Sequence, residues 1–147
     1  MIQISKHKGS EVQGAKFSII IPSWNNLDFL RLCIDSIRKN SHFKHQIIIH
    51  INEGKDGSLE WVIANHFDYT FSEINTGICW PLNAAATLAS TDYIVYMNDD
   101  MYACPDWDLE LWKEIEKLDN NLFFFSSTMI EPRTTNNNCV IQGQNFG

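Results

Sequence analysis

The chain has 147 residues, of which 44% are hydrophobic and 20% charged, and its formal net charge is -7. This is the size and composition of one globular domain with a substantial core, while the acidic balance and the lack of a basic stripe exclude nucleic acid as a partner. No apolar run approaches the roughly 20 residues that cross a bilayer, and the N-terminus lacks the apolar core of a signal peptide. We therefore expect a cytoplasmic protein without a transmembrane segment, with peripheral attachment to a membrane as the alternative.

The N-terminal part begins with a polar segment and continues into a strand-turn-helix unit. Residues 1–16 show no hydrophobic period, which predicts a flexible arm or a short edge strand. The apolar run 17–22 predicts a strand that is stopped by Pro22, because proline cannot donate to a sheet ladder. After the turn at 23–26, apolar residues recur at helical spacing from Leu27, and Asn25 or Asn26 is placed to cap this helix.

The same alternation continues along the chain. Further apolar runs, each followed by a polar or glycine-containing loop, predict strands at 46–51, 69–72, 93–97 and 122–125. The strand at 93–97 has apolar residues throughout and is expected to be buried on both faces. Helical patterns begin near Ser58, contain the small residues of 83–89, and cover 105–118.

Strands that alternate with helices predict an α/β fold, with a mostly parallel central sheet and helices on both faces. We place this domain at 17–125, while the polar segment 126–147 is assigned to a separate region. In an open α/β sheet, ligands bind at the carboxyl ends of the strands. Four polar loops follow predicted strands and are expected to converge there, at 23–26, 52–57, 75–77 and 98–100.

Two adjacent carboxylates, Asp99 and Asp100, follow the strand at 93–97. Neighbouring carboxylates repel each other and lose hydration when enclosed, so a cation is expected between them. Oxygen ligands suit Mg²⁺ or Mn²⁺. The alternative is that these residues, with Asn98, form an ordinary turn at the end of the strand.

The cysteines and histidines show no metal-binding spacing. The four cysteines are scattered, which argues against a zinc site or a disulfide framework. Cys33 falls on the apolar face of the first helix and is interpreted as a small buried hydrophobe. His50 lies inside a predicted strand, where a hydrogen-bonded structural histidine is the favoured interpretation.

The loop motifs together resemble those of family 2 glycosyltransferases, which have the Rossmann-like, nucleotide-sugar-binding GT-A fold. The motifs are Pro22-x-x-Asn25, Asp56-Gly57-Ser58, Asn75-x-Gly77 followed by Asn83, and Asn98-Asp99-Asp100. The resemblance covers about 17–107. It implies transfer of a sugar from a nucleotide-diphosphate donor, commonly a UDP-sugar, to a saccharide or other hydroxyl acceptor, with inversion and with Mn²⁺ or Mg²⁺ as cofactor.

The resemblance also implies roles for the acidic loop. Asp100 matches the metal-binding carboxylate of the family's Asp-x-Asp motif, and Asp99 matches the neighbouring acid that contacts the ribose or supports the metal. Asn98 stands where many members have the first Asp, which removes one charge. Leu82 occupies a position where a basic residue is common, so a contact with the diphosphate is missing here.

The other loops correspond to the nucleotide site of the family. Pro22, Ser23, Trp24 and Asn25 match the loop that lines the base, with Trp24 either stacking on it or simply packing. Asn52 or Glu53 is placed like the acidic residue that accepts from the base. Asn75 and Gly77 match the loop beneath the nucleotide. Structural alternatives are helix capping by Asp56 and Ser58, and acidic first-turn residues at Asp106 and Asp108.

The general base of such an enzyme is expected beyond Gly147, with 126–147 as the start of an acceptor-side region. The chain is therefore interpreted as a donor-binding portion or a reduced homologue, and an exposed truncation edge predicts self-association. Two alternatives stay open. One is a non-catalytic module that binds a nucleotide sugar or a protein, and the other, less favoured, is a nucleotidyltransferase.

Overall fold

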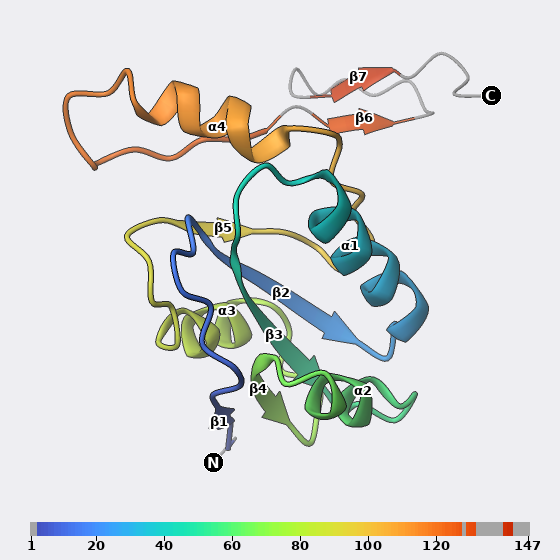
Figure 1. Ribbon diagram of the computed structural model, residues 1–147. Coiled ribbons are helices and arrows are strands. Elements are labelled where there is room, and N and C mark those ends of the chain that lie inside the picture. The colour runs from blue at the N-terminus through green and yellow to red at the C-terminus, as the bar shows by residue number, and fades with distance from the viewer. Residues whose placement is uncertain (1–2, 128, 132–139, 143–147) are drawn as a thin grey trace. The chain divides into compact units, whose positions relative to one another are not determined.

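A five-stranded sheet forms the centre of the chain in the computed structural model, which describes residues 3–127, 129–131 and 140–142. The chain divides into two units, 1–114 and 115–147, and the sheet belongs to the first. The strand order is β1-β4-β3-β2-β5, with β1 antiparallel to β4 and all other pairs parallel (Figure 1). The strands are β1 (Ser5–His7), β2 (Ser18–Trp24), β3 (Gln46–Asn52), β4 (Asp68–Ser72) and β5 (Ile94–Tyr96).

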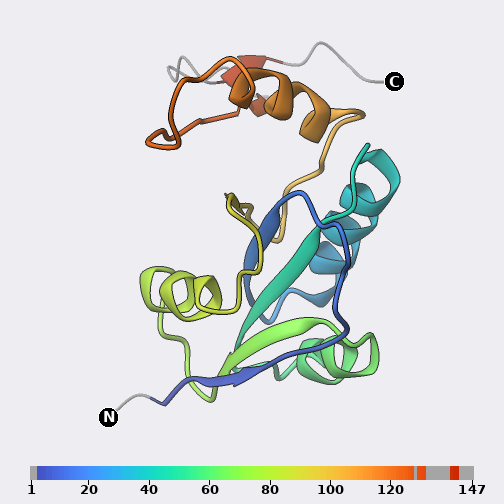
Figure 2. The same cartoon turned by 60° about the vertical axis from the view of Figure 1, so that its left-hand side comes forward.

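Helices cover both faces of this sheet, as predicted. In Figure 2, α1 and α2 lie on one side of the strands and α3 lies on the other. A fourth helix, α4, follows the loop that leaves β5. The bounds are α1 (Leu27–Asn40), α2 (Ser58–Ala64), α3 (Cys79–Ala86) and α4 (Trp107–Ile115). No helix in the described part of the chain combines the length and apolarity needed to span a membrane.

The core is built from the isoleucines of β2 and β3. Ile20 and Ile48 pack with Ala85 and Leu88 beneath α3. Because successive strand residues point to opposite faces, the alternate isoleucines, including Ile19, face α1 and α2. These isoleucine side chains are fully or almost fully buried, and each contributes roughly 1.5–3 kcal/mol to folding.

Pro22 does not end its strand, contrary to the sequence prediction. β2 continues to Trp24, and Pro22 lies opposite His50 of β3. Ile20 accepts a hydrogen bond from the amide of Met97 on the β5 side, so Pro22, two residues later, also directs its backbone toward that side. The pairing of β2 with β5 stops at Ile20, and no ladder bond is lost at Pro22.

β5 is shorter and more exposed than predicted. The expected strand at 93–97 was assigned two buried faces, but Ile94 and Tyr96 are 50% and 48% exposed. The reason is its position at the edge of the described sheet, because α3 covers the central residues Ile20 and Ile48. The carboxyl end of β5 nevertheless lies beside the carboxyl end of β2, where the site was predicted.

The N-terminal segment contains an edge strand, one of its two expected forms. β1 pairs with β4, and the chain then crosses close to the end of α2. A Cβ atom on Gly9 would lie 2.0 Å from the carbonyl oxygen of His66, so only glycine fits this approach. The Gly9 amide donates to Asp68 Oδ1 at 2.7 Å and fixes the crossing.

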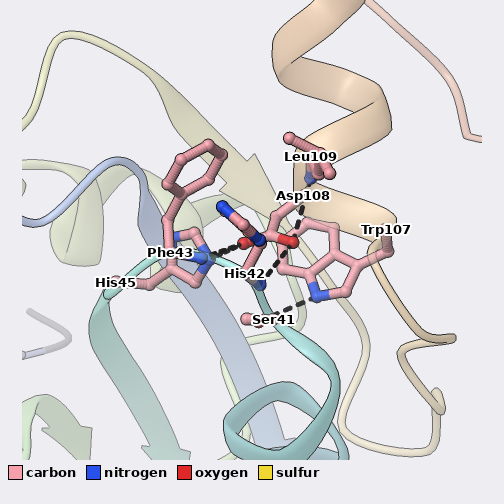
Figure 3. Close-up of polar contacts among 7 residues, drawn as sticks. All are labelled: Ser41, His42, Phe43, His45, Trp107, Asp108 and Leu109. Atoms are coloured by element: carbon pink, nitrogen blue, oxygen red, sulfur yellow. Dashed lines mark hydrogen bonds and ion pairs between the residues drawn. The ribbon is translucent and has the colours of Figure 1, made fainter.

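Asp108 joins the first turn of α4 to the loop between α1 and β3 (Figure 3). Its carboxylate is fully buried and accepts hydrogen bonds from the amides of His42 at 2.9 Å and Phe43 at 2.8 Å. His45 Nε2 lies 2.9 Å from the same carboxylate, and Trp107 donates to Ser41 beside it. The backbone hydrogen bonds outweigh desolvation and lower the pKa of Asp108. The predicted first-turn acid is therefore also an anchor for a neighbouring loop.

The second unit, 115–147, contains the parallel strands β6 (Met129–Glu131) and β7 (Val140–Gln142). The strand predicted at 122–125 does not form, and these residues pair with no strand of the described chain. Leu122 and Phe124 are 94% and 92% exposed. Most of the predicted polar segment at 126–147 lies outside the described residues.

Candidate functional site

The predicted loops converge on one cleft at the carboxyl ends of the central strands. Its volume is about 530 Å³. Every residue predicted to bind a nucleotide sugar or metal lines this cleft except Glu53, and two further residues, Asn26 and Ile78, join them. The lining residues are Pro22, Ser23, Trp24, Asn25, Asn26, Asn52, Asn75, Gly77, Ile78, Asn98, Asp99 and Asp100.

The loops that follow β2 and β3 are tied together at the start of α1. Asn25, which has a left-handed backbone with φ of 48°, accepts from the Lys55 amide at 2.8 Å. Asp56 Oδ2 accepts from the Leu27 amide at 2.7 Å, and Asp56 Oδ1 accepts from the Ser58 amide. One aspartate thus caps two helices. Asn26 occupies the N-cap position of α1, as predicted, but it makes no side-chain cap hydrogen bond, and Asp56 takes this role.

Glu53 lies beside the cleft and supports its rim. Its carboxylate accepts hydrogen bonds from Lys55 and Asn25, and the nearby Trp24 indole, followed by these two bonds, lowers the pKa of Glu53. Trp24 is 55% exposed, so much of its ring surface is open to solvent at the cleft. An exposed aromatic ring at a cleft is suited to stacking on a planar ligand.

Asn52 is buried, and its amide is directed at the loop between β4 and α3. Its Oδ1 accepts from the Thr76 amide at 2.9 Å, and its Nδ2 donates to the Gly77 carbonyl at 3.4 Å. The loop then presents Asn75, Gly77 and Ile78 to the cleft. Gly77 has φ of 77°, which disfavours any side chain there.

Asp99 is the half-buried member of the acidic pair. Its Oδ2 accepts from Ser23 Oγ at 2.7 Å, and Asn26 also donates to it. Burial raises the pKa of Asp99 above its usual value despite these bonds, and the neighbouring Asp100 adds to the shift. Asn26 thus serves the acidic loop, a role that the helix-cap interpretation concealed.

Asp100 is exposed and makes no hydrogen bond or ion pair with another residue of the described chain. Beside it, the Asn98 side-chain carbonyl accepts a hydrogen bond from the Tyr96 hydroxyl. Behind this loop lies the buried Cys33, whose pKa is raised to about 12 by desolvation and by the two aspartates. Cys33 is therefore an unreactive thiol, in agreement with its predicted packing role.

The cleft carries negative charge without a fixed positive partner. None of its lining residues, all within the described part of the chain, is Lys or Arg. Leu82, at the position where a basic residue is common in the family, instead packs against the core beneath α3. The described residues contain no cluster of three or more His, Cys, Asp or Glu side chains that would form a complete protein metal site. Two adjacent carboxylates instead suit a hard cation that takes its other ligands from phosphate and water.

The comparisons agree on the class of fold. Crystal structures of S. aureus TarS superpose with TM-scores of 0.58 for one form and 0.60 for the 1-349 form, at 19% and 22% sequence identity. The 1-349 form in complex with UDP and in complex with UDP-GlcNAc matches equally well. Each match covers 69% of this chain but only 20–32% of the TarS chain. The fold is thus of the GT-A glycosyltransferase class.

The family is identified from sequence. The model of Glycosyl transferase family 2 matches residues 18–142, so the chain belongs to this family, as its loop motifs predicted. No curated protein matches the chain.

Proposed function

We propose that this chain is the donor-binding portion of a glycosyltransferase that transfers a sugar from a nucleotide-diphosphate donor to a hydroxyl acceptor with inversion. The observation that carries the proposal is the single cleft in which Asp99 and Asp100 meet the loops after β2, β3 and β4. Family membership supports the same chemistry. UDP is the favoured nucleotide, since the TarS structures of the same fold contain UDP and UDP-GlcNAc.

A divalent cation, Mn²⁺ or Mg²⁺, is part of this proposal. The donor diphosphate would enter a cleft that has two carboxylates and no basic side chain, which is unfavourable unless a cation offsets the charge. Asp100, whose carboxylate is not engaged elsewhere in the described chain, would hold the ion, with Asp99 beside it. Such an ion would supply stabilisation of the charge that develops on the departing diphosphate.

The chain's own residues would bind and orient the nucleotide. The exposed face of Trp24, which lines the cleft, is available to stack on the base. Ser23 holds Asp99 at 2.7 Å and keeps the acidic loop close to the end of β2. Because Asp99 and Asp100 are both assigned to the donor and its cation, we assign no general base among the described residues.

Titration calorimetry on the 147-residue chain tests the proposal. The chain is titrated with UDP, GDP, CDP and ADP, each in the presence of Mn²⁺, Mg²⁺ or chelator. We expect UDP with Mn²⁺ to bind most tightly, and binding to weaken at least tenfold in chelator, since phosphate and carboxylate then repel each other. Absence of binding by all four nucleotides in the presence of either metal would overturn the proposal.

The tryptophan at the cleft offers a second, independent readout. Trp24→Ala removes a stacking surface worth about 1–3 kcal/mol per base, so the UDP dissociation constant should rise roughly 5- to 150-fold. Trp80→Ala is the matched control, because Trp80 is similarly exposed, at 54% against 55%, and does not line the cleft. Equal affinities of the two variants would show that Trp24 does not contact the base.

A further inference from the structure

A line of buried polar side chains runs through β3 and β4 to the loop at 73–77. His50 is fully buried in β3, with Nδ1 at 2.7 Å from Thr70 Oγ1 and Nε2 at 3.2 Å from Ser72 Oγ. Ser72 Oγ lies 3.1 Å from Asn52 Oδ1, and Asn52 Oδ1 also accepts from the amide and hydroxyl of Thr76. Burial lowers the pKa of His50 to about 4, so its ring is neutral at neutral pH.

The direction of every bond in this line is determined by the chemistry of its members. The backbone amide of Thr76 can only donate, which fixes Oδ1 of Asn52 as the atom that faces it. Ser72 has one proton and two acceptor-only neighbours, Asn52 Oδ1 at 3.1 Å and the Ile74 carbonyl at 2.9 Å, so this proton is shared between them and is not donated to His50. His50 therefore donates from Nε2 to Ser72, and its Nδ1 accepts from Thr70.

The loop depends strongly on this line for its position. Residues 73–75 and Gly77 are exposed, and Thr76 is the partly buried member. Asn52 contacts the loop at three points, through the Thr76 amide, the Thr76 hydroxyl and the Gly77 carbonyl. Asn52 Oδ1 already has three donors, which leaves it little capacity to accept from a nucleotide base.

We propose that His50, Ser72 and Asn52 are positioning residues that preform the loop at 73–77 for the donor, and that Asn52 acts through this loop and does not contact the base. The proposal concerning the donor rests on the proposed function. Preforming the loop removes ordering entropy that the ligand would otherwise have to overcome on binding.

The first test removes the middle hydroxyl of the line. In Ser72→Ala, His50 and Asn52 lose their link, so the Thr76 amide should exchange its hydrogen at least tenfold faster than in the wild type. The UDP dissociation constant with Mn²⁺ should rise about tenfold. Ser18→Ala is the matched control. Ser18 is a fully buried serine at the amino end of β2, bonded to Gln46 at 2.6 Å, and its loss leaves the loop untouched.

The second test separates the acceptor of Asn52 from its donor. Asn52→Asp retains an oxygen for Thr76 and Ser72 but adds a charge and loses the donor to the Gly77 carbonyl. Asn52→Leu has similar volume and neither acceptor nor donor. We expect Asp at this position to keep the slow exchange of the Thr76 amide, and Leu to lose it together with UDP affinity. A purely structural role would lower the thermal midpoint of the Leu variant without changing UDP affinity measured well below that midpoint.

The outcomes separate the two proposals. If the wild type binds no nucleotide, the proposed function fails, while exchange at Thr76 in the Ser72 and Asn52 variants still tests the preforming of the loop. If the wild type binds UDP and these variants bind it equally well, the positioning role is overturned. Unchanged exchange at Thr76 in both Ser72→Ala and Asn52→Leu would overturn it directly.

Discussion

Two acidic sites at different places in the first unit show opposite electrostatic behaviour. Asp108, in the first turn of α4, is fully buried, yet backbone amides and His45 surround its carboxylate and its pKa is lowered. Asp99, at the cleft, is only half-buried and has two side-chain donors, and its pKa is raised. Asp100 beside it has no hydrogen-bond partner in the described chain.

The difference separates a structural acid from a binding one. A carboxylate whose oxygens are all satisfied by the protein stabilises the fold and has no capacity left for a ligand. A pair of neighbouring carboxylates with few partners costs the free protein stability and gains most from a cation. The amino-acid type is the same in both places, and the number of available donors decides which role it has.

The largest expected effect is at the satisfied acid. Asp108→Ala leaves the amides of His42 and Phe43 and the His45 ring without their acceptor, and we expect a loss of about 4 kcal/mol in the free energy of unfolding. Urea denaturation measures it. Glu110→Gln, which disrupts only the exposed pair with Lys113 in the same helix, should change stability by less than about 0.5 kcal/mol. If Asp108→Ala lost no more stability than Glu110→Gln, the proposed difference between the two acidic sites would be contradicted.

His50, the buried histidine of β3, shows a third effect of burial on a titratable side chain. Because the pKa of folded His50 is lowered to about 4, the unfolded chain, with a histidine pKa near 6.5, binds more protons between these values. Stability from this residue is therefore present above about pH 6.5 and is lost as the pH falls toward 4, by on the order of 3 kcal/mol. The shift of the His50 ring proton in an NMR titration reads this pKa directly, and a midpoint near 6.5 would contradict the account.

Replacing each aspartate by asparagine should have smaller effects on stability, and these effects should have opposite signs at Asp99 and Asp108. Asp99 has a raised pKa, so its ionised form costs stability above the unfolded value near 3.9, and Asp99→Asn should stabilise the free protein at pH 7. This gain should vanish below about pH 3.9. Asp108 has a lowered pKa, so the electrostatic part of the loss in Asp108→Asn should be complete above about pH 3.9 and shrink as the pH falls further. Urea denaturation at pH 7 and pH 3 measures the change in the free energy of unfolding for both variants. A change of the same sign in both variants at pH 7 would contradict the proposed difference between the two acids.

Much of the first unit could be predicted from sequence, because its signals are local. Apolar runs such as 46–51 and helical spacing from Leu27 reflect burial, and polar loops after successive parallel strands must meet at one edge. This is why the residues predicted from Pro22 to Asp100 line one cleft, with Glu53 beside it. Family membership was predicted from the same loops.

The errors and omissions arise from contacts between residues far apart in sequence. The exposure of β5 depends on its place at the edge of the described sheet, and Leu122 and Phe124 are exposed because no element of the described part covers their side chains. Asp108 appears in sequence as an ordinary first-turn acid, since its partners at 42–45 lie more than 60 residues away. The cap of α1 likewise comes from Asp56, in a loop after another strand.

The most direct test of the account measures whether the acidic pair holds a cation for a donor diphosphate. Thermal unfolding of the wild type, Asp100→Ala and the exposed helix control Asp35→Asn is followed with and without UDP and Mn²⁺. At 100 times the dissociation constant, UDP should add about 2.7 kcal/mol to the wild type and to the control only when Mn²⁺ is present, and nothing to Asp100→Ala. Equal stabilisation of Asp100→Ala and the wild type by UDP and Mn²⁺ would contradict the central claim.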